Sequence, residues 1–218
     1  MGLLNEDAAL RKLGEETLER CLQILRSDSW KMEKKSTSED KVSSINLPDV
    51  GKLYLVEAVL NFPPKFLHDL IFDGVGDLHK WNKQFIASQR LKSIDPNTDI
   101  THIVTASLVS GLVASRDFVC VRHCREVEGT YFAAGCSIEH SLAPLQRNYI
   151  RGETKLSIFA IHPVPGKPDW SRFQWINCAR LGGWLPQYVV ELFFTDGMLD
   201  YVRYLRQFSD HLRREGCF

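Results

Sequence analysis

The chain has 218 residues, of which 44% are hydrophobic and 25% are charged, a composition typical of globular proteins. Its 27 Lys and Arg residues equal its 27 Asp and Glu residues, which argues against a nucleic-acid partner because such partners bind basic surfaces. No apolar run approaches the roughly 18 residues of a membrane-spanning helix. We therefore expect one domain over residues 1–218, most simply a monomer.

The first part of the chain predicts one helix and three strands. Apolar residues recur at roughly helical spacing over 3–26, with charged residues between them. Residues 30–35, 42–50 and 52–60 follow as short strands, and the last has a pronounced β pattern. Residues 65–75 then predict a short helix, because their apolar side chains form one face and Gly74 is suited to end it.

The second part predicts a series of strands and a long final helix. Turn signals such as DPNT at 95–98 and PGKPDW at 165–170 separate the strands. The period changes to that of a helix from Pro186 to about Arg214. Because strands and helices are segregated along the chain, the fold class is α+β with an antiparallel sheet. The predicted strands in this part cover 84–94, 99–108, 115–127, 130–141, 149–164 and 171–181.

The sequence contains no recognisable catalytic or cofactor-binding motif. It has no G-x-S-x-G, P-loop, H-E-x-x-H or G-x-G-x-x-G pattern, so we expect a binding protein without cofactor or metal rather than an enzyme. His102 and His123 lie in predicted strands, where histidine is usually structural, and Arg116 and Asp117 read as a local ion pair. The six cysteines, without any C-x-x-C, are typical of buried thiols in a reducing compartment, which favours a cytoplasmic protein.

Five stretches in this order resemble the START lipid-transfer domain, most closely its steroidogenic acute regulatory protein branch, which includes insect carotenoid-binding relatives. The resemblance spans nearly the whole chain. It implies a helix-grip fold, in which a curved antiparallel sheet wraps around a long C-terminal helix and encloses a hydrophobic tunnel for one lipid. The five stretches are HKWNK (79–83), ASRDFVCVR (114–122), YIRGE (149–153), HPVPGKP (162–168) and GGWLPQYVV (182–190).

The same resemblance implies where the lipid and the entrance lie. One side of the C-terminal helix would face the tunnel or the sheet, and plain core packing explains each of its residues equally well; these are Val190, Phe194, Met198, Tyr201 and Leu205. A loop over the tunnel mouth and the end of that helix would form the gate. We favour the loop 141–147, because Leu142, Pro144 and Leu145 form an apolar tip suited to transient contact with a membrane. The loop 163–170, with Trp170, is the alternative.

Arg122 raises a specific question. In the branch, its equivalent points into the tunnel and pairs with an acid whose position here is Ile103. Because an unpaired buried guanidinium costs several kcal/mol, three alternatives follow. Arg122 points outward, pairs with another acid such as Asp117 or Glu139, or hydrogen-bonds a ligand hydroxyl, backbone carbonyl groups and trapped water. The candidate ligand-binding residues beside it are His102, Ile103 and Ser107.

Further departures from the branch lie near Arg122. Ser115 replaces a proline, Arg180 replaces an acid, and the bulky Leu108 and Val109 follow Ser107 where relatives have small residues. The resemblance makes cholesterol or a related sterol the first candidate cargo. The missing acid and added apolar side chains keep a carotenoid as the alternative. A lipid-sensing regulator or an enzyme on the same fold are the less favoured readings.

Overall fold

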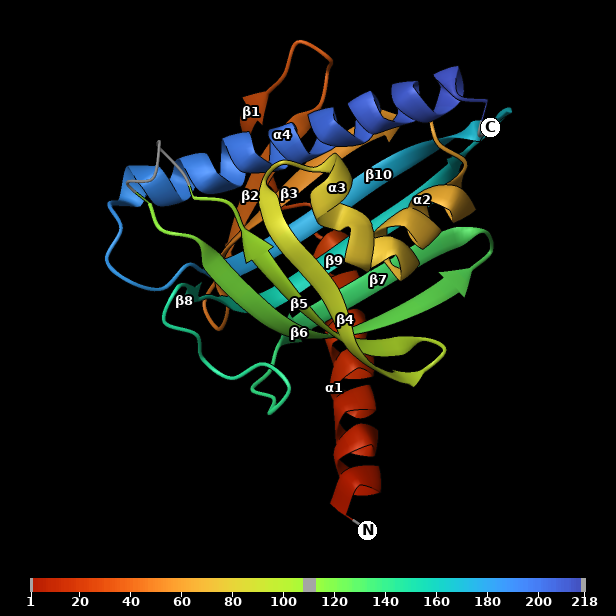
Figure 1. The fold of residues 1–218 in the computed structure, drawn as a ribbon. Helices are drawn as coiled ribbons and strands as arrows, with labels where there is room; N and C mark the ends of the chain where they lie inside the picture. The colour runs from red at the N-terminus through yellow and green to blue at the C-terminus, as the bar shows by residue number, and fades with distance from the viewer. Residues whose placement is uncertain (1, 108–112, 217–218) are drawn as a thin grey trace.

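The computed structural model describes residues 2–107 and 113–216, and Figure 1 shows their arrangement. The helices are α1 (Gly2–Leu25), α2 (Pro64–Ile71), α3 (Leu78–Trp81) and α4 (Gln187–Arg214), with a 3₁₀ turn, η1, at Asp73–Asp77. The strands are β1 (Lys31–Lys35), β2 (Lys41–Leu47), β3 (Gly51–Leu60), β4 (Phe85–Asp95), β5 (Thr98–Thr105), β6 (Arg116–Val127), β7 (Thr130–Ser137), β8 (Ile150–Arg151), β9 (Glu153–Val164) and β10 (Lys167–Arg180).

One curved sheet forms the body of the molecule. Its strand order is β1-β2-β3-β10-β9-β7-β6-β5-β4, and neighbours along this path are antiparallel, whereas β8 adds a short parallel pairing to β6. Register shifts interrupt the β4–β5 ladder at three places and the β9–β10 ladder at two. Such shifts bend strands and increase their twist, which helps the sheet to curve around a helix.

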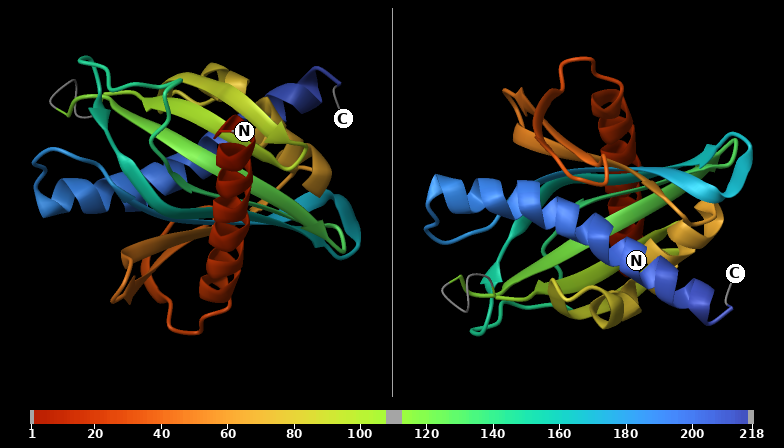
Figure 2. Two further views of the ribbon diagram at one scale, coloured as in Figure 1. Left: turned by 90° about the horizontal axis from the view of Figure 1, so that it is seen from below. Right: turned by 90° about the horizontal axis from the view of Figure 1, so that it is seen from above.

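The two long helices lie on opposite faces of this sheet. Seen from below, α1 crosses in front of the strands, and seen from above, α4 does (Figure 2). On the outer face, Leu18, Cys21 and Ile24 of α1 pack with Ile158 of β9 and Ile176 of β10. On the inner face, the apolar side of α4 packs with β3, β10 and α2; its fully buried members include Met198, Val202 and Leu205.

The predicted α+β helix-grip architecture is confirmed. The order of the predicted strands and helices gave the α+β class, and the resemblance to the START domain gave the helix-grip arrangement. The 3₁₀ turn and α3 were not predicted, because segments of five and four residues are too short to show a period. The strand predicted at 149–164 is divided into β8 and β9. Within the described residues, no helix is both long and apolar enough to span a bilayer.

Candidate functional site

A cavity of about 990 Å³ lies between the inner face of the sheet and α4. Its size is at the upper end of the range of about 300–1,000 Å³ that is common for small-molecule sites. Most of its wall is apolar or aromatic, with Phe85, Phe118, Phe159 and Trp175 on the strands and Phe194 on α4. Such a wall suits a large hydrophobic ligand.

Six of the residues proposed from the sequence line this cavity. The sheet side contributes Ile103, Ser107 and Arg122, and α4 contributes Phe194, Met198 and Tyr201. Burial raises the pKa of Tyr201, so its phenol stays neutral. The residues Leu108 and Val109, which follow Ser107, lie outside the described residues.

Three other proposed ligand-binding residues do not line the cavity. Val190 and Leu205 belong to the apolar core beside it. His102 lies on the opposite face of β5, because alternate residues of a strand point to opposite sides. Its Nε2 is 3.0 Å from Oδ2 of Asp117. The structure therefore places this side chain away from any ligand in the tunnel.

Arg122 has an acidic partner, which is Asp99. The Nε and Nη2 atoms of Arg122 donate to Asp99 Oδ1 and Oδ2 at 2.9 and 2.6 Å. The two residues face each other directly in the β5–β6 ladder. The proposed pairing of this arginine with another acid is therefore confirmed, but the acid is Asp99 and not Asp117 or Glu139. An outward orientation is wrong, and a ligand is not needed to satisfy the arginine.

The same arginine also holds the end of α2 against the sheet. Its Nη1 and Nη2 donate to the carbonyl oxygens of Ile71 and Phe72 at 3.1 and 2.7 Å, and its Cζ lies 4.3 Å from the Phe72 ring centroid. Cations are favourable at a helix C-terminus, where carbonyl groups lack intrahelical partners. Arg90 of β4 completes the cluster, since its Nε donates to Asp99 at 2.7 Å.

Asp99 was not predicted as the partner of Arg122, although its position along the strand indicated the correct face. It lies four residues before Ile103, so both side chains point to the same face of β5. The prediction considered the position of the branch's acid, Ile103, and the acids Asp117 and Glu139, but not Asp99. Strand alternation therefore makes Asp99 a candidate partner of Arg122, although the register of β5 and β6 is needed to choose it.

A second buried charge cluster lies on the outer face of the same two strands. Asp117, with 1% of its side chain exposed, accepts hydrogen bonds from Arg151 Nε at 3.0 Å and Nη2 at 2.8 Å. Burial raises the pKa of Asp117, but the bonds from Arg151 and His102 outweigh it and hold this pKa below its usual range. Arg116 instead donates to the Leu181 and Ala114 carbonyl oxygens, so the expected Arg116–Asp117 ion pair is wrong.

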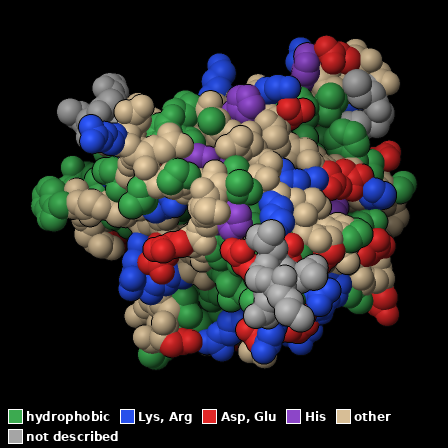
Figure 3. Space-filling model, turned by 60° about the horizontal axis from the view of Figure 1, so that its bottom comes forward, with side chains coloured by type: hydrophobic (Ala, Val, Ile, Leu, Met, Phe, Trp, Pro, Cys, Tyr) green, Lys and Arg blue, Asp and Glu red, His purple; other side chains and the backbone are tan. Residues whose placement is uncertain are grey.

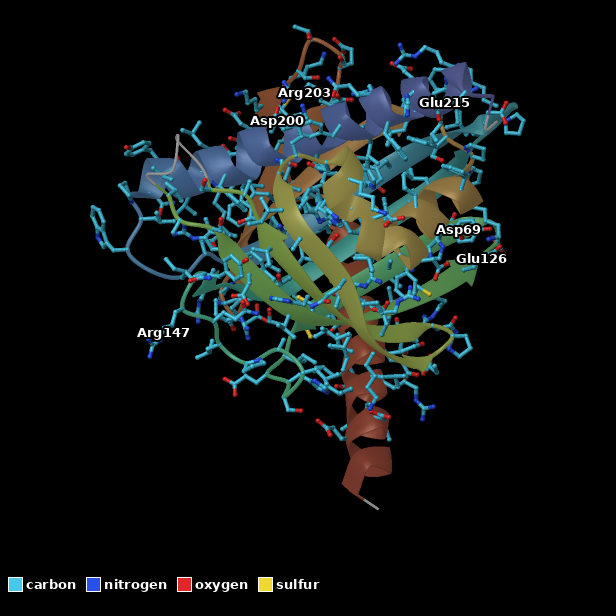
Figure 4. All side chains as sticks on the ribbon, in the orientation of Figure 1. Asp69, Glu126, Arg147, Asp200, Arg203 and Glu215 are labelled. Carbon is cyan, nitrogen blue, oxygen red and sulfur yellow. The ribbon has the colours of Figure 1, made fainter. Side chains whose placement is uncertain are left out.

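The proposed gate loop does not border the cavity. Leu142 and Leu145 are exposed, as expected, but neither they nor Pro144 belong to the cavity wall. Figure 4 shows Arg147, at the end of this loop, far from Asp200 and Arg203 on α4. Trp170, of the alternative loop, does not line the cavity either.

Exposed apolar side chains do border the cavity at the start of α4. Trp184, Tyr188 and Leu192 line it and are 87%, 65% and 50% exposed. Hydrophobic side chains gather at the corresponding left edge of the molecule in Figure 3. The sequence showed this segment only as part of a family motif, GGWLPQYVV, with no sign that it reaches solvent.

The chain is similar to known proteins over most of its length. Residues 14–215 match the model of the START domain. The chain is 32% identical over 207 residues to the mitochondrial steroidogenic acute regulatory protein of Gallus gallus, covering 94% of this chain and 73% of that protein. It is 30% identical over 204 residues to the Homo sapiens protein of the same name, covering 93% and 72%.

A solved structure shows the same fold. Human StAR-related lipid transfer protein 5 superposes with a TM-score of 0.84 at 24% identity, over 92% of this chain and 96% of that chain. The family match spans nearly the whole chain and agrees with the helix-grip fold and its internal cavity. We conclude that this chain belongs to the START domain family of lipid-transfer domains.

Proposed function

We propose that this protein binds one sterol in the cavity beneath α4 and carries it between membranes as a monomer, without chemical conversion. The observation that carries the proposal is the cavity of about 990 Å³ with its largely apolar wall. The relatives named steroidogenic acute regulatory protein support a sterol as the cargo. A carotenoid is less favoured, since its main argument, a missing acid beside Arg122, does not hold.

The energetics of transfer need only burial and exposure of apolar surface. Burying about 400 Å² of a sterol contributes about 10 kcal/mol, before the costs of association are subtracted. A bilayer offers the same ligand a similar environment, so movement between membrane and cavity is nearly isoenergetic. The rate then depends on how easily the ligand passes the cavity entrance.

We place that entrance at the start of α4. Trp184, Tyr188 and Leu192 combine high exposure with contact to the cavity. Exposed apolar groups of this kind favour insertion into the membrane interface, where Trp and Tyr are enriched. The protein would dock by this edge, and the lipid would pass directly between bilayer and cavity.

The test of cargo uses purified protein and vesicles. We expect extraction of labelled cholesterol from donor vesicles at one molecule per protein, transfer to acceptor vesicles, and no absorption band in the blue. If the protein instead extracts xanthophyll and turns yellow, the cargo is a carotenoid and not a sterol. A protein that moves neither lipid would contradict lipid transfer altogether.

The test of the entrance compares two exposed apolar residues. Trp184→Ser should slow vesicle-to-vesicle transfer about tenfold, because an interfacial Trp contributes on the order of 1.5–3 kcal/mol when buried. Leu145→Ser is the matched control, because Leu145 is 78% exposed but does not line the cavity. If only Leu145→Ser slows transfer, the entrance lies at the loop 141–147 and not at the start of α4.

A further inference from the structure

One buried hydroxyl group in the cavity wall has no partner. Thr101, on β5, is 1% exposed and lines the cavity. Its Oγ1 forms no hydrogen bond with any of the residues that the structure describes. A buried hydroxyl in this state costs free energy, because it has lost its hydrogen bonds to water without gaining others. The cost disappears when a group inside the cavity bonds to it.

The polar groups on either side of Thr101 are already satisfied. On the same face of β5, Asp99 accepts from Arg90 and Arg122, and the Thr105 hydroxyl bonds to the backbone of Arg116 at 3.0 and 3.3 Å. These groups hold the protein together. Thr101 therefore stands out on this strand as a hydroxyl that is free for a ligand.

The cavity wall near Thr101 carries no unbalanced charge. Arg122 forms four hydrogen bonds, two of them to Asp99, and Arg90 is shared between Asp99 and Asp73. Lys83, another cation of the wall, is exposed. A carboxylate or phosphate group at the buried end would thus lose its hydration without gaining a counter-ion, which is costly.

We propose that Thr101 selects the ligand, by hydrogen bonding to the hydroxyl group of a neutral hydroxylated lipid at the buried end of the cavity. This inference rests on the proposed function and narrows it to one class of head group. A threonine hydroxyl can donate a hydrogen bond to the oxygen of an alcohol or accept one from its O–H group. Lipids without a hydroxyl, and lipids with an ionised head, bind less well.

The experiment pairs a change in the protein with a change in the ligand. Partition between phosphatidylcholine vesicles and protein is measured for cholesterol, for cholestene, which lacks the hydroxyl, and for cholesteryl hemisuccinate, which carries a carboxylate. The variants are Thr101→Val, which keeps the shape, Thr101→Ser, which keeps the hydroxyl, and Ile103→Val, a neighbour on the same face of β5 that changes volume alone.

We expect Thr101→Val to lower the preference for cholesterol over cholestene about tenfold, the loss of one well-buried hydrogen bond. Thr101→Ser should retain most of that preference, and Ile103→Val should change both affinities alike. Wild-type protein should bind cholesteryl hemisuccinate more weakly than cholesterol. The ligand-free Thr101→Val protein should melt a few degrees higher, because it no longer buries an unpartnered hydroxyl.

Two kinds of failure are distinguishable. If wild-type protein binds cholesterol but Thr101→Val leaves the preference unchanged, the inference about Thr101 is overturned and sterol binding stands. Tight binding of the hemisuccinate would likewise overturn the choice of a neutral head group. If wild-type protein binds none of the three sterols, the proposed function fails, and this inference fails with it.

Discussion

The strand pair β5–β6 carries a buried charge cluster on each of its faces, and the two clusters differ in what they hold. On the inner face, Asp99 binds Arg122 and Arg90, which together hold the end of α2. On the outer face, Asp117 binds Arg151 and His102, and Arg151 reaches the carbonyl oxygen of Ala143 at 3.1 Å.

The comparison shows that charge beside a lipid cavity need not serve the lipid. Arg122 lines the cavity, yet its bonds go to Asp99 and α2, just as those of Arg151 on the outer face go to Asp117 and a loop. Both clusters fasten a connecting segment to the sheet. Recognition of a ligand is then left to a neutral group that the protein does not satisfy, Thr101.

The inner cluster should be the more sensitive to loss of its acid. Asp99→Asn leaves two arginines without their shared carboxylate, one of them with only 13% of its side chain exposed. We expect the free energy of unfolding to fall by about 3–5 kcal/mol, as measured by urea denaturation. Asp73→Asn, at an exposed partner of Arg90, should cost about 0–1 kcal/mol. Equal effects of the two substitutions would contradict a dominant role for Asp99.

Loss of the acid in the outer cluster should lower the free energy of unfolding less, and the size of this loss should depend on pH. Asp117→Asn removes charged hydrogen bonds to Arg151, whose side chain is 21% exposed, and should cost about 2–3 kcal/mol at neutral pH. The control is Glu153→Gln, because Glu153 pairs with Arg180 at the surface, where ion pairs contribute about 0–1 kcal/mol.

The sign of the pH effect follows from the lowered pKa of Asp117. The stability it contributes is present above the unfolded-state pKa of about 4 and is lost as pH falls through the lower folded-state value. The difference in unfolding free energy between wild type and Asp117→Asn should therefore shrink below about pH 4. A difference that is constant from neutral to acid pH would show that the bonds do not depend on the carboxylate charge.

The smallest of the three expected losses of stability concerns Gly135, which packs against the side chain of Arg122. Gly135 faces Arg122 across the β6–β7 ladder, and a Cβ there would lie 2.8 Å from the Val121 carbonyl oxygen and 3.2 Å from Arg122 Cγ. Gly135→Ala should cost about 1–3 kcal/mol through overpacking. Gly76→Ala, where a Cβ meets nothing within 4 Å, is the matched control. A neutral Gly135→Ala would mean that the Arg122 stem adapts freely.

The alternation of apolar and polar residues, the helical spacing at both ends and the five family motifs determined the fold class and the family from the sequence alone. These signals are local, because each depends only on residues that are near one another in the sequence. Alternation also settles which face of a strand a residue occupies, so His102 and Ile103, adjacent on β5, do not share one face. The sequence held that information, although the prediction placed both residues in the tunnel.

Only the tertiary structure decided which groups meet. Alternation assigns a face but not a register, so the partner of Arg122 emerged only when β5 and β6 paired Asp99, not Ile103, opposite it. Exposure of Leu145 was predictable, whereas its distance from the cavity depends on how β7, β8 and α4 are arranged. The sequence could not show that the Thr101 hydroxyl lacks a partner either. Whether a buried group is paired depends on all the neighbours that the fold places around it.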